Sequence, residues 1–396
     1  MATKTETGSI SVRLDQEQEA EMTNPTETYY PGLEGVIAGE TGISTIAGGL
    51  QYRGYSIQDL AEKSTFEEVA YLLIHGNLPS EAEFASFKSR VADARAVPDA
   101  VFTLFRSLPI DSNAMDVLRT GVSILAHHDT DTGSNELDDS VAKAERLLAA
   151  IPTLVTAWAR IKAGNDPVAP LSDLDFSSNL LNMLHDSEPA EVERHALDVS
   201  LILYAEHEYN ASSFTARVAA STLADLHGAI VAAIAALKGP LHGGANEKAV
   251  EVLEEVGSRD NAEPWIRNAL ETKRLVMGFG HRVYKDEDPR ATILKRFCME
   301  ISPERNATEW EEMATIIEKV MWDEKHLPPN MDWPAGRLYR MIGLETEIYT
   351  PLFVAARVTG WAAHIIEQHS GNRLIRPRSN YIGPEPQDYV SMSERG

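Results

Sequence analysis

The chain has 396 residues, of which 43% are hydrophobic and 24% are charged. This balance is ordinary for a globular protein, and the length allows two or three domains with an ample core. A formal net charge of −24 disfavours nonspecific binding to nucleic acid. The same charge means that a site for anionic substrates has to gather its own cations against the overall field.

Cysteine usage and hydropathy narrow the location of the protein. The single cysteine, Cys298, excludes an internal disulfide and any cysteine-based metal cluster, which agrees with a reducing cytoplasm. The N-terminus has no apolar signal core, and the most apolar run, around residues 229–237, is too short to span a bilayer. We therefore expect a cytoplasmic protein that binds neither nucleic acid nor membrane.

Local patterns predict an all-α fold with a few short N-terminal strands. Residues 1–28 are polar and predict a mobile tail, and the Gly-rich, β-branched stretch from Tyr29 to Tyr55 predicts one or two short strands or hairpins. Capping boxes at 65–68 and 80–83 each begin a helix. Apolar periodicity between Gly and Pro breaks predicts further helices at 113–127, 138–163, 189–208, 213–237, 245–256, 262–276, 289–301, 308–326 and 351–369. The tail from 372 to 396 should be irregular and should lie across another surface.

The segment 278–290 is the strongest candidate site, because it combines a histidine, several cations and a helix start. Its two glycines permit a sharp turn before His281. Asp288 as cap and Pro289 at the first helical position predict a helix N-terminus with Arg290 in its first turn. Such an end attracts anions. The segment therefore predicts a carboxylate site with a proton donor beside it.

Two further histidines lie in distinctive surroundings. His207 precedes Glu208, but a zinc-hydrolase helix would need a second histidine at position 211, which is Ala. The alternative is a histidine near a helix end. His242 lies on a tight Gly- and Pro-rich loop before a helix, and the positive end of that helix disfavours an extra proton on the imidazole. The alternative is a turn histidine without a function.

One acid and two arginines complete the candidates. Asp332 lies in a Pro-rich loop between apolar neighbours, where burial would raise its pKa and make it a better base. The alternative is an Asp that caps a helix near residue 337. Arg357 interrupts an apolar helix and marks either an ion pair or an anion site. Arg376 belongs to a C-terminal arginine cluster that, taken alone, is most simply solvated.

A second cluster, His127-His128-Asp129, has the residue types of a metal site and is similar to metal-dependent phosphohydrolases of the HD type. Its neighbours predict a solvated loop, which we favour. His364 and His369 are expected to be structural.

Taken together and in order, these motifs resemble the signature of the citrate synthase family, which includes 2-methylcitrate synthases. The resemblance runs from about residue 31 to the C-terminus. The segments that carry it are His207-Glu208-x-Asn210-Ala211-Ser212, Gly239-Pro240-Leu241-His242-Gly243-Gly244-Ala245-Asn246, Gly278-Phe279-Gly280-His281-Arg282-Val283-Tyr284, Asp288-Pro289-Arg290, Asn330-Met331-Asp332 and Arg376-Pro377.

The resemblance implies a helical homodimer or an assembly of dimers. A large domain would comprise 29–243 and 342–396, and a small domain at 244–341 would close over the substrates. The implied reaction is Claisen condensation of acetyl-CoA with oxaloacetate, followed by hydrolysis of citryl-CoA to citrate and CoA, the entry step of the tricarboxylic acid cycle. No metal and no permanently bound cofactor is implied, and acetyl-CoA is a cosubstrate.

The resemblance also implies roles for single residues. Asp332 would take a proton from the acetyl methyl group, His242 would donate a hydrogen bond to the thioester carbonyl, and His281 would polarise and finally protonate the oxaloacetate carbonyl. The dicarboxylate would be held by His207, Arg290, Arg357 and, from the partner subunit, Arg376. CoA would lie along Val276, Met277, Gly278, Phe279 and Gly280, with Arg282, Lys285 and Lys325 near its phosphates.

One departure leaves the acyl substrate open. Many citrate synthases have Asp-Phe-Tyr-Ser-Gly where this chain has Asp332-Trp333-Pro334-Ala335-Gly336. The stretch beside the proposed base is altered, so propionyl-CoA, and with it 2-methylcitrate synthesis, is the nearest alternative. Two alternatives come from other classes: a metal-dependent phosphohydrolase around His128 and Asp129, and a non-catalytic helical binding protein.

Overall fold

The computed structural model describes residues 29–281 and 284–395, so the predicted tail at 1–28 and Arg282 lie outside the described residues. The chain divides into two compact units, one of residues 1–40 and 376–396 and the other of residues 41–375. In the described part of the first unit, two short 3-10 helices (Pro31–Leu33 and Met392–Glu394) interrupt irregular chain, which confirms the irregular C-terminal stretch.

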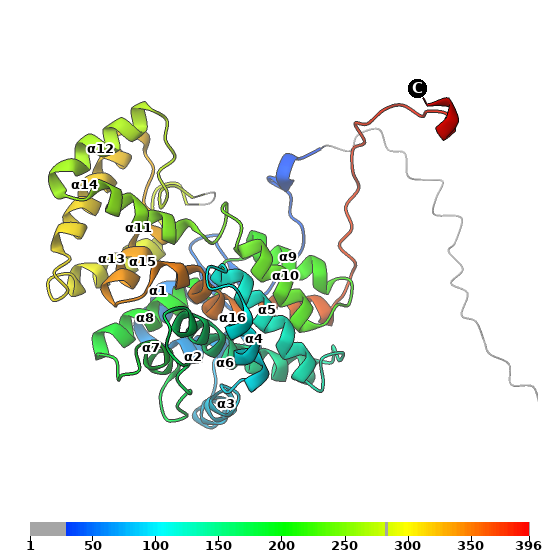
Figure 1. Cartoon of the computed structure of the whole chain (residues 1–396), viewed down its shortest axis with the longest axis horizontal. Coiled ribbons are helices and arrows are strands. Elements are labelled where there is room, and N and C mark those ends of the chain that lie inside the picture. The colour runs from blue at the N-terminus through cyan, green and yellow to red at the C-terminus, as the bar shows by residue number, and fades with distance from the viewer. Residues whose placement is uncertain (1–28, 282–283, 396) are drawn as a thin grey trace, which may run out of the picture. The chain divides into compact units, whose positions relative to one another are not determined.

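The second unit is mostly helical, which confirms the all-α prediction (Figure 1). Three short strands form an antiparallel sheet in the order β1 (Ser44–Thr45), β2 (Gln51–Tyr52), β3 (Tyr55–Ser56). The helices are α1 (Ile57–Lys63), α2 (Phe66–His75), α3 (Glu81–Asp93), α4 (Asp99–Ser107), α5 (Ala114–His128), α6 (Leu137–Lys162), α7 (Phe176–His185), α8 (Glu191–Tyr204), α9 (Ala211–Ala220), α10 (Leu226–Leu237), α11 (Ala245–Val256), α12 (Arg259–Glu271), α13 (Pro289–Ile301), α14 (Thr308–Lys325), α15 (Asp332–Met341) and α16 (Tyr349–Ser370).

Side-chain caps mark some of the predicted helix starts. Ser80 and Glu83 form the predicted capping box, whereas Thr65 accepts the Glu68 N–H without the reciprocal bond. The predicted single helix at 213–237 is wrong. The chain breaks at 221–225, and Asp225 restarts it as α10 by accepting the Gly228 N–H at 2.9 Å. Helices α1, α4, α7 and α15 were not predicted. Helices α4 and α15 have no side-chain cap, whereas α1 and α7 are capped by Ser56 and Asp175, so the caps of these two were overlooked.

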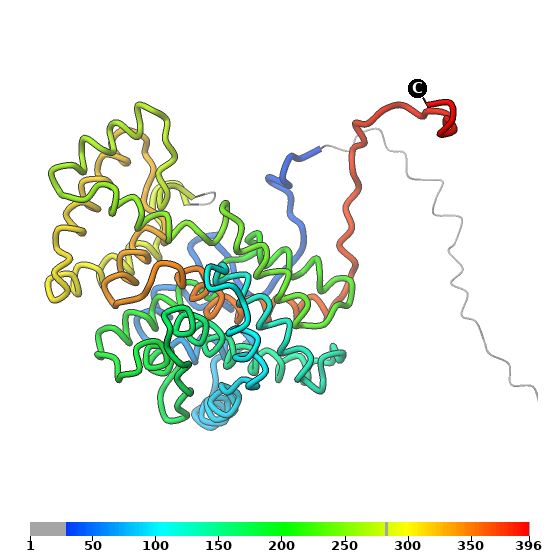
Figure 2. The backbone as a smooth tube through the Cα atoms, viewed as in Figure 1, coloured from blue at the N-terminus to red at the C-terminus, as the bar shows by residue number. Residues whose placement is uncertain are grey.

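Two apolar cores organise the second unit. The larger surrounds α16, which is buried along most of its length and packs against α2, α6, α8, α9 and α10. The smaller joins α11, α12 and α14, and all its buried members lie between residues 249 and 333. Figure 2 shows the backbone of these helices grouped at one side of the unit. The predicted boundary of a small domain at 244–341 stays a prediction. Among the described residues, no helix combines the length and the apolar character that crossing a membrane requires.

Gly360 permits α16 to lie against the end of α8. A Cβ at this position would lie 2.5 Å from the Ala205 carbonyl oxygen and would also overlap the Glu206 carboxylate. We expect Gly360→Ala to lower the free energy of unfolding by about 1–3 kcal/mol, since overpacking forces backbone shifts. Thermal and urea unfolding measure the loss. Gly133→Ala is the control, because its Cβ meets nothing within 4 Å. Equal stability of the two variants would contradict this packing.

Candidate functional site

The segment 278–280 turns sharply and is hydrogen-bonded to residues 328–330, which precede Asp332. Gly278 and Gly280 have φ angles of 87° and 73°, as the predicted turn requires. The Gly280 N–H donates to the Pro328 carbonyl at 2.8 Å, and the Asn330 N–H donates to the Gly278 carbonyl at 2.9 Å. The Asn330 side chain adds a bond of 3.0 Å to the Gly280 carbonyl. The two stretches that carry His281 and Asp332 are therefore held side by side.

Asp288 joins the same two stretches a second time. As predicted, it caps α13 by accepting the Arg290 N–H at 3.1 Å. Its carboxylate also binds the Arg290 guanidinium through Nε at 3.0 Å and Nη2 at 2.8 Å. Its Oδ2 accepts the Met331 N–H at 3.2 Å. Arg290 is thus fixed in a buried ion pair, and the residue before Asp332 is fixed by the same carboxylate.

Asp332 is the first residue of α15, so the predicted loop around it is wrong. Pro334 suggested a break, but proline is tolerated in the first turn of a helix, where its missing N–H is not needed. Tyr204 at the end of α8 donates its hydroxyl to Asp332 Oδ1 at 2.8 Å. Burial raises the pKa of Asp332 to about 6, although the Tyr204 hydrogen bond and the charge of Arg290 oppose the shift. The upward shift of this pKa is the one that the apolar sequence neighbours of Asp332 predicted.

His242 is held by Ser212 at the start of α9. Its Nε2 lies 2.8 Å from the Ser212 hydroxyl oxygen and accepts the Ser212 backbone N–H at 3.3 Å. A backbone N–H can only donate, so the proton of a neutral ring is assigned to Nδ1. Burial and the charge of Arg357 lower the pKa of His242 to about 4. The expected neutral imidazole is present, but desolvation causes it rather than the helix end.

His207 and His281 lie together beside Tyr284. The two imidazole centroids are 5.2 Å apart, and His207 Nε2 lies 3.1 Å from the Tyr284 hydroxyl. Burial and the charge of Arg290 lower the pKa of His281 to about 4. The same causes, in the same order, hold the pKa of His207 well below its usual value. Sequence reasoning missed Tyr284 as a member of the site, although it lies inside the candidate segment.

Arg357 supplies the second buried cation. Its Nε donates to the Tyr204 carbonyl at 2.6 Å, and its guanidinium lies over the Phe353 ring at 4.7 Å. Its Nη1 is buried and has no hydrogen-bond partner among the described residues. Leaving such a donor unpaired is costly. The arrangement therefore suits an anionic ligand that accepts from Nη1.

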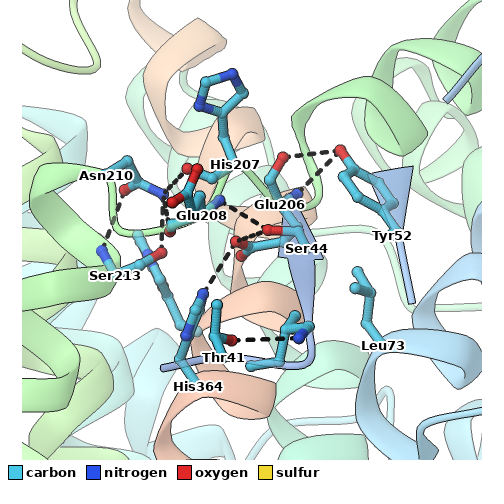
Figure 3. A network of polar contacts seen from close by, with 12 residues as sticks. Thr41, Ser44, Tyr52, Leu73, Glu206, His207, Glu208, Asn210, Ser213 and His364 are labelled. Atoms are coloured by element: carbon cyan, nitrogen blue, oxygen red, sulfur yellow. Dashed lines mark hydrogen bonds and ion pairs between the residues drawn. The ribbon is translucent and has the colours of Figure 1, made fainter. Parts of the chain in front are cut away.

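Glu206, which sequence reasoning did not single out, is the centre of the polar network next to His207 (Figure 3). Its Oε1 accepts from the Ser44 hydroxyl at 3.1 Å and lies 2.9 Å from His364 Nε2. Arg217 donates to His364 Nδ1 at 2.9 Å, so the histidine proton is assigned to Nε2 and donated to Glu206. His364 therefore has the structural part expected of it. The Glu206 charge also opposes the fall in the pKa of Arg357 that burial causes.

The remaining predicted residues are scattered. Lys285 and Lys325 are exposed, and Lys285 donates to the His281 carbonyl at 3.3 Å. Arg376 is exposed and belongs to the other unit. Val276 is buried in the smaller core, whereas Met277 is half-buried. The CoA-binding roles of these residues stay predictions.

Trp333, in the stretch that departs from the family pattern, is fully buried. Its ring lies 4.7 Å from that of Phe279, directly beneath Gly278, and its Nε1 donates to Glu318 at 2.9 Å. The indole therefore packs against the turn at Gly278 and leaves no space there for a larger side chain.

The side chains of His127, His128 and Asp129 do not form a metal site. Arg146 binds the Asp129 carboxylate at 2.8 Å, while His127 and His128 are exposed at the end of α5. Within residues 29–281 and 284–395, no group of three or more His, Cys, Asp or Glu side chains could hold a metal ion.

Comparisons with known proteins agree on one family. A family model described as citrate synthase, C-terminal domain, matches residues 32–378. Citrate synthase 2 of Bacillus subtilis is 44% identical over 93% of this chain and 100% of its own length. The 2-methylcitrate synthase of Shewanella oneidensis is 41% identical over 94% of this chain and 100% of its own.

Solved structures agree as well. The citrate synthase of Thermotoga maritima has a TM-score of 0.83 at 39% identity and covers 92% of this chain and 99% of its own. The citrate synthase of Thermoplasma acidophilum, solved with carboxymethyl coenzyme A and oxaloacetate, has a TM-score of 0.88 at 36% identity and covers 93% of this chain and 100% of its own.

Asp288 offers a test of the site's scaffold. Removing its carboxylate would leave the buried Arg290 charge without its partner, which typically costs about 3–5 kcal/mol. We expect Asp288→Ala to lower the urea midpoint and the melting temperature accordingly. The control is Asp286→Ala, since Asp286 is an exposed neighbour on the same segment. If both variants unfold like the wild type, Asp288 does not hold Arg290 in the manner described.

Proposed function

Since the chain belongs to the citrate synthase family, we propose that this enzyme condenses acetyl-CoA with oxaloacetate and hydrolyses citryl-CoA to citrate and CoA. The observation that carries the proposal is the pairing of opposite pKa shifts among buried groups. Asp332 has a pKa raised to about 6, and His242 has one lowered to about 4. At neutral pH this gives an ionised base near its working pKa and an uncharged hydrogen-bond donor.

Enolisation is the first step in this proposal. Asp332 takes a proton from the acetyl methyl group, and the Nδ1–H of His242 donates to the thioester oxygen, where negative charge develops. Phe353 links the surroundings of the two groups: its ring centroid is 6.3 Å from that of His242 and 4.2 Å from that of Tyr204, whose hydroxyl donates to Asp332. A neutral donor suits this task because it stabilises the enol without releasing its own proton.

Carbon–carbon bond formation needs oxaloacetate to be held and polarised. Arg290 and Arg357 are buried guanidinium groups, and planar guanidinium matches a carboxylate in two parallel hydrogen bonds. The unpaired Nη1 of Arg357 supports a ligand there. His207 assists the binding, and His281 donates to the ketone oxygen, which takes a proton as the enol carbon attacks the ketone carbon. Water then cleaves the thioester of citryl-CoA, and CoA leaves as the thiol.

The assembly and the CoA contacts belong to the same proposal. We infer a cytoplasmic homodimer, or an assembly of dimers, in which Arg376 of the partner subunit completes the dicarboxylate site. Exposed apolar residues of the unit that contains Arg376 support a role in assembly: Tyr29, Ile37, Tyr381, Ile382 and Tyr389. Closure of residues 244–341 would exclude water while the enol exists. CoA would follow the 276–280 stretch toward Arg282, Lys285 and Lys325, with no metal required.

The placement of Trp333 bears on the acyl group. Its fully buried indole donates to Glu318 and packs against Phe279, so a large side chain fills this part of the altered stretch. This supports acetyl-CoA over propionyl-CoA as the substrate. Relatives named for each reaction resemble the chain at similar identity, 44% and 41%, and therefore do not decide the question.

The base is tested by Asp332→Asn. The amide preserves size and can still accept from Tyr204, but it cannot take the methyl proton. Positioned acid–base catalysis is worth about 100-fold to 10,000-fold, so kcat should fall by at least about 100-fold. Thiol release from acetyl-CoA with oxaloacetate is the measurement. Asp323→Asn, at an exposed position of α14, should keep wild-type activity. Condensation by Asp332→Asn near the wild-type rate would refute the assignment.

The acyl preference is tested by thiol release with acetyl-CoA and propionyl-CoA side by side, with oxaloacetate saturating. We expect kcat/KM to favour acetyl-CoA by roughly 10-fold to 200-fold, the range that one methylene supplies. A preference for propionyl-CoA would make the protein a 2-methylcitrate synthase. Thiol release with neither substrate would overturn the proposed function itself.

A further inference from the structure

Tyr204, the last residue of α8, is hydrogen-bonded both to the proposed base, Asp332, and to a proposed substrate-binding residue, Arg357. Its hydroxyl donates to Asp332 Oδ1 at 2.8 Å, and its carbonyl oxygen accepts from Arg357 Nε at 2.6 Å. The side chain is only 2% exposed and packs against Phe353, with the ring centroids 4.2 Å apart. A single buried residue thus contacts both the proposed base and a proposed substrate-binding cation.

We propose that Tyr204 is a positioning residue for the condensation: its hydroxyl orients the Asp332 carboxylate and keeps it ionised at neutral pH. This inference rests on the proposed function, because it assigns a task to Tyr204 only if Asp332 is the base. Tyr204 does not itself exchange a proton with the substrate.

The surroundings of the phenol fix the direction of this hydrogen bond. The side-chain amide of buried Asn246 lies close enough to Tyr204 to lower the phenol's pKa, although its Nδ2 makes no full hydrogen bond. An amide nitrogen can only donate, so its approach leaves the phenol proton to point at Asp332. Burial and the nearby Asp332 charge hold the pKa of Tyr204 well above its usual value. The phenol therefore remains a donor throughout the working pH range.

The hydrogen bond also distinguishes the two carboxylate oxygens. Tyr204 occupies Oδ1, so Oδ2 is the oxygen left to accept the methyl proton. A carboxylate with one fixed oxygen cannot rotate freely, and proton abstraction requires the base to lie within hydrogen-bond reach of the substrate in a defined geometry.

Other charged and titratable groups face Asp332 from several elements, but they act at a distance. Around the carboxylate, the groups that affect its pKa or are affected by its charge are Tyr204 on α8, Asp288 and Arg290 at the start of α13, Arg357 on α16 and Tyr339 on α15 itself. Among these described residues, Tyr204 contributes a hydrogen bond, and Asp288, Arg290 and Arg357 contribute through their charges. Tyr339 is a phenol whose own pKa is raised mainly by burial and further by the Asp332 charge. Removing the phenol hydroxyl therefore removes a direct contact and leaves the other groups in place.

The test is the pH dependence of kcat/KM for Tyr204→Phe, which keeps the ring and its packing on Phe353. Activity requires ionised Asp332, so it falls as pH drops through the pKa of that group, about 6 in the wild type. Without the donor this pKa rises, and we expect the acid limb to move upward by about one pH unit, the size expected of one hydrogen bond to a charged group. KM for oxaloacetate should stay within about twofold, because the bond to Arg357 uses the backbone carbonyl.

Tyr349→Phe is the matched control. Tyr349 is another fully buried phenol, its hydroxyl donates to the Leu344 carbonyl at 3.3 Å, and Asp332 is not among the groups that shift its pKa. This variant should leave the acid limb where it is in the wild type. A shift of equal size in both variants would show a general effect of losing a buried hydroxyl and would overturn the proposal.

A second substitution keeps the test informative if Tyr204→Phe folds poorly. Replacing Tyr204 by 3-fluorotyrosine retains the hydroxyl and makes it a stronger donor, so the acid limb should move below that of the wild type. An unchanged acid limb in both Tyr204 variants, with wild-type condensation measured in the same assay, would overturn the role of Tyr204 alone. Absence of thiol release by the wild type would instead overturn the proposed function.

Discussion

The bond network of the Asp288 carboxylate is the constraint on which the site depends. This carboxylate accepts two hydrogen bonds from the Arg290 guanidinium and one from the Arg290 N–H, which caps α13. It accepts a fourth from the N–H of Met331, which lies 43 residues further along the chain. A buried guanidinium without a partner would be too costly to keep in this position. By satisfying Arg290 and placing Met331, the same carboxylate fixes a proposed substrate-binding cation and the first turn of α15, where Asp332 lies.

Burial sets the protonation states that the proposed chemistry needs. Desolvation always disfavours the charged form, so it raises the pKa of Asp332 and lowers those of His207, His242 and His281. The arginines resist the same pressure because guanidinium is intrinsically basic and because Glu206 and Asp288 lie close to them. The result is a group of imidazoles that stay neutral near two cations, in a chain whose net charge is −24.

The end of α8 shows how a buried acid redirects the chain. Periodicity predicts a helix through residue 208, but α8 ends at Tyr204. Glu206 instead enters the network of Ser44 and His364, and Glu208 adopts a φ of 53°, outside the helical region. Leaving the helix at this point turns His207 toward Tyr284 and leaves the Tyr204 carbonyl for Arg357. Helical propensity could not reveal this, since the partners of Glu206 lie more than 150 residues away.

The sequence by itself determined the all-α class, most of the helices, the glycine turn and the cap at Asp288, because caps, breaks and apolar periodicity act within a few residues. It also brought His207, His242, His281, Arg290 and Asp332 together as members of one family signature, and the resemblance implied a role for Arg357 beside them. Only the tertiary structure decided that Asp332 begins a helix, that Trp333 lies beneath Phe279, and that Tyr204, Glu206 and Tyr284 belong to the site. The contacts that give these residues their roles, and the burial that sets the pKa values, join segments far apart in the chain, so no local pattern records them.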